Sequence, residues 1–224
     1  RLHFTTKPEP ADVFIICVQT PYRETEEHKR VSDMRFVESA AREVGSVLRA
    51  GNLCVLESTS PPYSTRMVEK IVSEVSGLAP EQFMTAHCPE RIIPGRMLIE
   101  LRENDRIIGS NRPESAQFAK EIYEKVVTGG TIRLTDDLTA EMCKLTENTF
   151  RDINIAFANE LAQICRADGM DVYEVIRIAN KHPRVNILSP GPGVGGHCIS
   201  VDPWFLVGDY PDIVNVIRAA RKVN

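Results

Sequence analysis

A glycine-rich segment near the carboxyl end of the chain carries the residue whose chemistry is easiest to name. Residues 190–196 read Pro-Gly-Pro-Gly-Val-Gly-Gly, and His197 and Cys198 follow directly. Four glycines and two prolines in seven residues exclude the interior of a helix or strand, and so bare a backbone lets a polar ligand approach closely. We therefore predict that Cys198 is a nucleophile, with Asp202 as a carboxylate four residues later. The alternative is an inert thiol in a structural loop, which is the default interpretation for any one of the six cysteines.

A second group of polar residues lies at helical spacing. Lys144, Asn148 and Arg151 are separated by four and then three residues, so a helix would place all three on one face. A solvated helix face gives the same pattern. Because asparagine is a mediocre helix former, its position between two cations favours a face that meets a ligand.

Polar motifs also follow three apolar runs in the first half of the chain. They are Gln19-Thr20-Pro21, Ser58-Thr59-Ser60-Pro61 and Cys88-Pro89-Glu90-Arg91. Each motif by itself is typical of a loop at the end of a strand. Ligands of parallel α/β sheets, however, bind outside the carboxyl ends of the strands, so three polar strand ends together predict a shared site.

The elements that must position these residues alternate along the chain. Strands are expected at residues 13–18, 53–56, 83–87, 106–109 and 131–134, and the charged stretch 22–30 is expected to be a loop. Apolar residues recur at helical spacing within residues 34–47 and 67–75, and a further helix is expected over 113–126. This alternation predicts an α/β fold with a parallel sheet.

From Asp136 onward the pattern becomes helical. Apolar residues from Leu138 to Ile164 mark one amphipathic helix that ends by Gly169; its ~30 residues would span about 45 Å. That is too long for an ordinary crossover, so we expect it to bridge domains or to pair with a second subunit. A shorter helix is expected after Asp171, with Glu174 completing a capping box, and a last helix over residues 213–220.

Composition excludes several classes of protein. The chain has 224 residues, a formal net charge of −4 and 42% hydrophobic residues, which is ordinary for a globular protein and not basic enough for a nucleic-acid partner. No run of ~20 apolar residues or signal-peptide pattern is present, so we expect no membrane partner. The six cysteines show no metal-ligand or disulfide spacing. We therefore expect no metal and a reduced, cytoplasmic protein.

Three separated motifs resemble the signatures of the UDP-glucose/GDP-mannose dehydrogenase family, in the family's order. They are Cys88-Pro89-Glu90-Arg91, the residues from Ala140 to Phe150, and Gly191 to Asp202 followed by Pro203-Trp204. The resemblance covers nearly the whole chain. It implies the second half of a Rossmann-like parallel sheet followed by an all-α central domain with one long helix. Residues 1–135 would be a partial NAD-binding domain, and residues 136–224 the central domain for substrate binding and dimerisation.

The resemblance also implies a chemistry. The family oxidises the C6 alcohol of a UDP-sugar or related nucleotide sugar to a carboxylate with two NAD⁺, and the homodimer would form through the long helix. Cys198 would attack the aldehyde to give a thiohemiacetal and then a thioester. Lys144 would be the acid/base group and, with Asn148, stabilise the oxyanion, while Asp202 and Glu90 would assist proton transfer or position water.

The remaining sites follow from the same resemblance. Thr20 and Thr59 match positions on the cofactor side. Substrate-binding positions of the acetamido-sugar branch match Arg91, Ile92, Lys144, Asn148, Arg151, His182, Arg184 and Gly195. The segment around His197 and Cys198 most resembles the branch that oxidises UDP-N-acetyl-D-mannosamine. Pro94 stands where the glucose branch has a glutamate, so that residue's catalytic role does not transfer. UDP-N-acetylglucosamine, UDP-glucose and GDP-mannose remain alternative substrates.

A dinucleotide-binding strand followed by GxGxxG is expected in such an enzyme and is missing here. Residues 191–196 resemble that motif superficially, but no predicted strand precedes them and they include a proline. We therefore expect an internal piece of the enzyme, with incomplete nucleotide anchors and weak activity by itself. A non-catalytic dimerisation module is a second hypothesis. A cysteine hydrolase is a third; it is disfavoured because adjacent residues such as His197 and Cys198 rarely meet as base and nucleophile, although His182 could serve.

Overall fold

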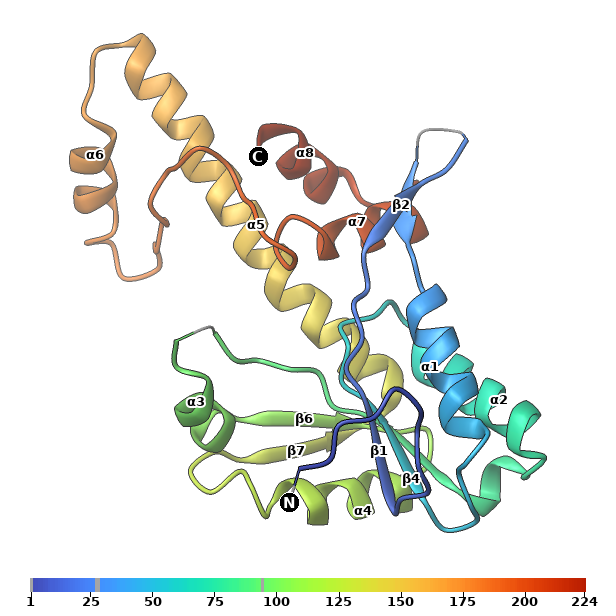
Figure 1. Cartoon of the computed structure of the whole chain (residues 1–224). Helices are drawn as coiled ribbons and strands as arrows, with labels where there is room; N and C mark the ends of the chain where they lie inside the picture. Colours follow the sequence, from blue (N-terminus) through green and yellow to red (C-terminus); the bar gives the residue numbers. More distant parts are fainter. Residues whose placement is uncertain (1, 27–28, 94) are drawn as a thin grey trace. The chain divides into compact units, whose positions relative to one another are not determined.

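The computed structural model describes residues 2–26, 29–93 and 95–224 (Figure 1). The chain forms two compact units, and each is described by itself below. The first unit comprises residues 1–20 and 33–144, and the second comprises residues 21–32 and 145–224. The functional boundary expected between residues 135 and 136 stays a prediction, because these units divide the chain by compactness alone.

A five-stranded sheet is the centre of the first unit. Its strands occur in the order β1 (Val13–Ile16), β4 (Leu53–Leu56), β5 (Met84–His87), β6 (Arg106–Gly109) and β7 (Ile132–Thr135). All five strands were predicted: β4 and β6 have the predicted bounds, and the ends of β1, β5 and β7 are shifted by one or two residues. The α/β class is therefore confirmed.

One pair of strands departs from the parallel arrangement that the sequence predicts. β1, β4 and β5 are parallel to one another, as are β6 and β7, but β5 and β6 are antiparallel. Their one pairing joins His87 to Gly109, the last residues of the two strands. Because the two strands overlap only there, the reversal still leaves their carboxyl ends adjacent. The sheet is thus mixed. The residues after each of these two strands lie beside the other strand: the Ser110 hydroxyl donates to the Thr85 carbonyl in β5, and Glu90 pairs with Arg106 in β6.

Helices cover both faces of this sheet. Helices α1 (Arg35–Gly45) and α2 (Ser64–Ser76) lie side by side (Figure 1) and share a core with Phe14, Ile16, Cys54 and Leu56. Helix α4 (Pro113–Tyr123) packs against Leu53, Val55, Ala86 and Ile108 on the other face. Burial of β4 on both faces explains why its sequence is a continuous apolar run. The short helices η1 (Pro80–Gln82) and α3 (Met97–Glu103) lie in connections, and α3 was not predicted.

The second unit begins with a hairpin where a loop was expected. Strands β2 (Tyr22–Glu24) and β3 (Arg30–Ser32) pair antiparallel, with Arg23 opposite Val31. The prediction was wrong because strands of three residues, rich in charge, give no readable alternation of apolar and polar residues. The tip, residues 27 and 28, lies outside the described residues.

Four helices complete the chain. Helix α5 (Asp137–Ala167) has 31 residues, as the long apolar periodicity predicts. Asp171 caps α6 (Val172–Ala179) through a bond from Tyr173 N, but Glu174 pairs with Arg177 and does not complete the predicted capping box. Helix α8 (Asn215–Val223) matches the predicted last helix, whereas α7 (Asp202–Asp209) was not predicted. None of the helices in the described part of the chain is long and apolar enough to cross a membrane.

Candidate active site

Cys198 lies at the surface of the second unit, one turn before α7. Gly193 and Gly196 have φ angles of +115° and +81°, which only glycine adopts readily, so the loop needs glycine at both positions. The Cys198 carbonyl accepts hydrogen bonds from Val201 N at 3.0 Å and Asp202 N at 2.9 Å. The thiol is therefore exposed on a turn whose backbone is fixed to the start of a helix.

Asp202 and Asn148 join this turn to the long helix. Asn148 Nδ2 donates to Asp202 Oδ2 at 2.6 Å. Asn148 is 5% exposed and Asp202 is 3% exposed. Asp202 is in the first turn of α7, where the helix dipole favours a negative charge. The interpretation of Asn148 as part of a solvated helix face is thus wrong. The structure gathers three predicted catalytic residues, Cys198, Asp202 and Asn148, within one unit.

An ion pair that the sequence did not reveal holds this cluster in place. Arg221 on α8 donates from Nε to Oδ2 of the fully buried Asp152 at 2.7 Å and from a second nitrogen to Oδ1. A further guanidinium nitrogen reaches the carbonyl oxygen of Ser200 at 3.2 Å. Arg221 therefore links α8, α5 and the segment directly after Cys198. Nothing in the local sequence signals a pair whose members are 69 residues apart.

Three thiols of the first unit differ from Cys198. Burial raises the pKa of Cys54 and of Cys88 to about 12. Cys17 is exposed at the surface, but partial desolvation and the neighbouring Glu57 carboxylate raise its pKa to about 12 as well. Only the thiolate form of cysteine is a strong nucleophile, so these three thiols are inert at neutral pH. Their environments support the default interpretation for them.

Thr20 and Thr59 lie beyond the carboxyl ends of β1 and β4. Thr20 Oγ1 donates to the Thr59 carbonyl at 2.7 Å, and the Ser58 hydroxyl donates to the Val18 carbonyl at 2.6 Å. Both threonines are half-buried. Hydroxyl bonds between the two strand ends therefore form one polar edge, as the sheet-edge argument predicts.

Glu90 lies at the corresponding position after β5, against a buried arginine. Arg106 is 2% exposed and donates to Glu90 Oε2 at 2.9 Å, while its other terminal nitrogen lies 3.8 Å from Glu57 Oε1. The Tyr123 hydroxyl donates to the same Glu57 oxygen at 2.6 Å. Sequence reasoning missed this network. The signal for it was an arginine at the start of the apolar strand Arg106-Ile107-Ile108-Gly109.

Arg91 and Ile92 follow Glu90 and are half-buried. The backbone N–H of Arg91 donates to Glu90 Oε1 at 2.6 Å, and its guanidinium donates to the Asp105 carbonyl at 2.9 Å. Glu90 is thus oriented from two sides. Pro94, whose identity separates the sugar branches, lies outside the described residues.

The remaining predicted residues differ in exposure. Lys144 is half-buried in the part of α5 that belongs to the first unit. Arg151, His182, Arg184 and Gly195 are all exposed in the second unit. The backbone N–H of Arg184 donates to His182 Nδ1 at 3.3 Å, so these two residues share a turn after α6. Exposed cations suit recognition of a diphosphate.

Comparison with known proteins covers both halves of the chain. Residues 1–127 match the family model described as "UDP-glucose/GDP-mannose dehydrogenase family, NAD binding domain", and residues 138–224 match the central domain of the same family. The chain belongs to the UDP-glucose/GDP-mannose dehydrogenase family. The resemblance that the three sequence motifs indicated is confirmed.

Several relatives in this family are similar along the whole chain. An NDP-N-acetyl-D-galactosaminuronic acid dehydrogenase of Ralstonia solanacearum is 53% identical over 100% of this chain and 53% of its own length. A UDP-N-acetyl-D-mannosamine dehydrogenase of Methanococcus maripaludis is 52% identical over 100% of this chain and 50% of its own. The solved structure of UDP-D-ManNAc dehydrogenase from Pyrococcus horikoshii has a TM-score of 0.89 at 44% identity, and covers 96% of this chain and 50% of that one. The chain thus spans about half the length of these relatives.

The family match makes NAD the cofactor, and the polar edge of the first unit can be tested against it. A nicotinamide bound at the carboxyl ends of β1 and β4 would meet small hydroxyl side chains and exposed peptide groups. Thr20 and Thr59 supply these groups, and their mutual hydrogen bond fixes their orientation. The residues present therefore fit the nicotinamide end of the cofactor.

Proposed function

We propose that this chain is the core of an NAD-dependent dehydrogenase that oxidises the C6 alcohol of a nucleotide sugar to a carboxylate. The observation that carries the proposal is the cluster in the second unit. The exposed Cys198 lies on a turn fixed to Asp202, whose carboxylate is bonded to Asn148. A thiol on a turn that leads into an oriented carboxylate and amide supplies the groups that a covalent oxidation of an aldehyde requires.

The proposed reaction has two oxidation steps and one hydrolysis. Lys144 accepts the hydroxyl proton as the C6 alcohol loses a hydride and becomes an aldehyde. NAD⁺, when bound, supplies the hydride acceptor for both oxidations. The Cys198 thiolate then adds to the aldehyde carbon, and the oxygen of the resulting thiohemiacetal takes up a proton. A second hydride leaves that carbon, the proton returns to a base, and a thioester remains.

Water completes the proposed cycle. It attacks the thioester carbonyl, the carbon–sulfur bond breaks, and the Cys198 thiol and the sugar carboxylate are released. The cation of Lys144 and the amide of Asn148 stabilise the oxyanion. Asp202 and Glu90 hold or take up the protons of the attacking water. Glu90 is suited to this because Arg106 and the Arg91 N–H fix its carboxylate while it remains 31% exposed.

Recognition of the substrate is assigned to cations and polar groups that the family resemblance indicates. We propose that Arg91, Ile92, Arg151, His182, Arg184 and Gly195 contact the nucleotide sugar, with the arginines on its diphosphate. UDP-N-acetyl-D-mannosamine is the proposed sugar. A second candidate is the N-acetyl-D-galactosamine analogue, because a relative that is 53% identical is named for the corresponding uronic acid.

The test is the ratio of NADH to acid. The 224-residue chain, and the whole gene product where its gene encodes more, would be incubated with NAD⁺ and each nucleotide sugar in turn. We expect two NADH per acid with one acetamido sugar, and at least a ~10³-fold loss of rate in Cys198→Ala. Cys17→Ala removes another exposed cysteine and should leave the rate unchanged. Full activity in Cys198→Ala, or no turnover by the whole gene product with any of these sugars, would overturn the proposal.

We also propose that two copies pair through α5. Phe150, Phe157 and Ile164 recur every seven residues on the second-unit part of this helix and are 65%, 54% and 53% exposed. An apolar stripe with a seven-residue repeat is self-complementary between antiparallel or parallel copies of one helix. Light scattering during size-exclusion chromatography should show a dimer that Phe157→Glu converts to a monomer. Gln163→Glu, on the same helix but off the stripe, should remain dimeric; a monomeric wild type would contradict the pairing.

A further inference from the structure

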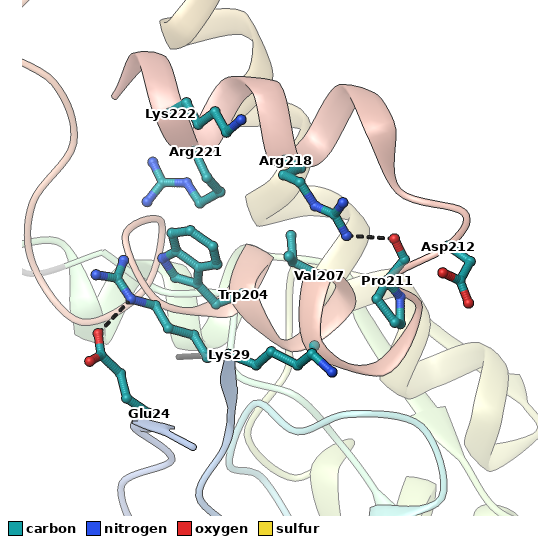
Figure 2. A pocket seen from close by; sticks show the side chains of 11 residues that line it. Glu24, Lys29, Trp204, Val207, Pro211, Asp212, Arg218, Arg221 and Lys222 are labelled. Carbon is teal, nitrogen blue, oxygen red and sulfur yellow. Dashed lines mark hydrogen bonds and ion pairs between the residues drawn. The ribbon is translucent and has the colours of Figure 1, made fainter. Parts of the chain in front are cut away.

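A cavity in the second unit is left unused by the proposed reaction. Its volume is about 810 Å³, and it lies between the β2–β3 hairpin and helices α7 and α8 (Figure 2). None of the described residues assigned above to substrate or cofactor lines it. The cavity lies within the size range of ligand pockets, roughly 300–1,000 Å³, so the chemistry of its walls decides which ligand it can accept.

Positive charge dominates the walls. Five cations line the cavity, namely Lys29, Arg30, Arg218, Arg221 and Lys222, against the two carboxylates of Glu24 and Asp212. Three of the five lie on α8, with Arg221 and Lys222 next to one another. Glu24 pairs with Arg30 at 3.1 Å, and Arg221 pairs with Asp152 outside the wall. Arg218 and Lys222 still outnumber Asp212, so the lining keeps a net positive charge even when Lys29, Arg30 and Arg221 are left out of the count.

The single tryptophan of the chain orients two of these cations. The guanidinium carbon of Arg30 lies 4.5 Å from the centre of the Trp204 ring. The guanidinium carbon of Arg221 lies 6.0 Å from the same centre (Figure 2). A cation–π contact holds a guanidinium without cancelling its charge. The ring thus helps to orient Arg30 along the wall. The guanidinium of Arg221 is bonded to Asp152 and to the Ser200 carbonyl, so Arg221 adds positive charge to the wall and not hydrogen-bond donors.

The backbones of the hairpin and of α7 are in close contact at Gly208. A Cβ atom on Gly208 of α7 would lie 2.6 Å from the Arg30 carbonyl oxygen. Only glycine permits this approach, and it brings the backbone of Arg30 onto the helix that carries Trp204. On the opposite wall, Arg218 donates to the Pro211 carbonyl (Figure 2). This bond uses one of the five guanidinium N–H donors and fixes the direction of the others.

We propose that this cavity binds a di- or triphosphate group, as a second anion site separate from the substrate site. Arginine and lysine together favour phosphate oxygens. The volume exceeds what one phosphate needs and accepts a pyrophosphate with or without a nucleoside. Inorganic pyrophosphate and a nucleoside diphosphate share the chemistry that the walls recognise.

Trp204 makes the site directly observable, because it is the only tryptophan in the sequence. Tryptophan emission of the 224-residue chain would be followed during titration with sodium pyrophosphate and, separately, with UDP, at low and at physiological ionic strength. We expect a saturable change that weakens with salt. Equal affinities would show that the phosphates alone are recognised, and tighter binding of UDP would show that the nucleoside adds contacts.

Two variants localise the ligand. Arg218→Gln with Lys222→Gln removes both charges, keeps polar side chains, and should weaken binding by more than about tenfold, with unchanged circular dichroism. Lys125→Gln removes an exposed cation of the first unit and should leave binding as it is. Arg184→Ala should also leave the emission change intact, because Arg184 belongs to the proposed substrate site.

Three results would contradict the proposed phosphate site. An absence of saturable change, or equal binding by the Arg218→Gln/Lys222→Gln variant and the wild type, would show that the cavity does not bind phosphates. Loss of binding in Arg184→Ala alone would place the ligand at the substrate site. The dehydrogenase assay is a separate readout: we expect the double variant to keep the two-to-one ratio of NADH to acid, so failure of either proposal leaves the other intact.

Discussion

Arg106 in the first unit and Arg221 in the second are both almost fully buried, but their carboxylate partners differ. Arg221 faces Asp152, which is completely buried and accepts two hydrogen bonds from it. Arg106 faces Glu90 and Glu57, which are 31% and 17% exposed, and it reaches Glu57 only at 3.8 Å. The pair of Arg221 and Asp152 is closed, meaning that both side chains are buried. The pair of Arg106 and Glu90 is open, because the Glu90 carboxylate reaches the surface.

This difference separates two roles for a buried guanidinium. A closed pair stabilises the fold chiefly because removal of one partner leaves an uncompensated charge inside the protein. A pair whose carboxylate reaches the surface can orient that carboxylate for an external ligand. Arg221 accordingly ties α8 to α5 near Cys198, and Arg106 holds the exposed carboxylate that we assign to proton transfer. Each role predicts a different response to substitution.

The largest effect is expected from Asp152→Ala. The substitution leaves the Arg221 guanidinium buried beside Asn224 without a carboxylate, so the free energy of unfolding should fall by about 3–5 kcal/mol. Urea denaturation followed by circular dichroism measures it. Glu174→Ala, which breaks the exposed pair with Arg177, is the matched control and should cost less than about 1 kcal/mol. Equal losses in the two variants would contradict the distinction between closed and open pairs.

The two regions also differ in how much of them the sequence could predict. The strands, the long helix and the polar ends of three strands were predictable because hydrophobic periodicity is local. Cys198, Asn148 and Asp202 were identified from the glycine-rich loop, from helical spacing and from family resemblance. In the structure they form one cluster.

Contacts between distant residues were not predictable in this way. Arg106 and Glu57 are 49 residues apart, and Arg221 and Asp152 are 69 residues apart. No local period connects the members of such a pair. The hairpin of β2 and β3 and the short helices α3 and α7 were also missed. Predicted elements of similar length were marked by an apolar run, as in the four-residue strands, or by a capping residue, as in α6, and the hairpin has neither signal. Tertiary packing decides their structure.

A further buried carboxylate, Glu141, extends the comparison, because the donors described for it are not arginines. Its contribution to stability should therefore depend on pH. Glu141 on α5 accepts bonds from Tyr63 N at 2.8 Å and from the N–H and hydroxyl of Thr65 at 2.7 and 2.6 Å. Burial outweighs these bonds and raises the pKa of Glu141 from its ordinary 4.5 to about 7. Between these two values the folded state keeps a proton that the unfolded state has lost. The stabilisation is therefore fully present below pH 4.5 and is lost as the pH rises to 7.

Glu141→Gln tests this directly. The wild type should lose up to about 1.4 kcal/mol of unfolding free energy per pH unit in that window, relative to the variant. Urea denaturation at pH 5, 6, 7 and 8 measures the difference. Above pH 7 the difference should become constant. A difference that does not vary between pH 5 and 7 would show that the three hydrogen bonds keep Glu141 ionised.

Arg106→Lys should show whether Arg106 orients Glu90 for catalysis or only stabilises the fold. Lysine keeps the charge but lacks the planar fork of N–H donors that fixes the direction of a carboxylate, so we expect a loss of about 1–2 kcal/mol in unfolding free energy and a fall in kcat with little change in KM. Tyr123→Phe removes the hydrogen bond to Glu57, at a cost of about 1 kcal/mol, without touching Glu90, and should leave kcat unchanged. An equal fall in kcat in both variants would assign Arg106 a purely structural role.

The smallest effect should come from the loop that carries Cys198. Gly193 has a φ of +115°, and a Cβ there would lie 2.6 Å from the Asn224 carbonyl oxygen. Asn224 also donates to Asp152 Oδ1 at 2.8 Å, so a displacement of Asn224 by the new methyl group would disturb the ion pair of Asp152 and Arg221. Gly193→Ala should therefore lower the unfolding free energy by at least about 1 kcal/mol. Gly191→Ala is the control within the same loop, because Gly191 has no positive φ and a methyl group added there would meet nothing within 4 Å. Equal denaturation midpoints for the two variants would show that the loop adapts without disturbing the pair between Asp152 and Arg221.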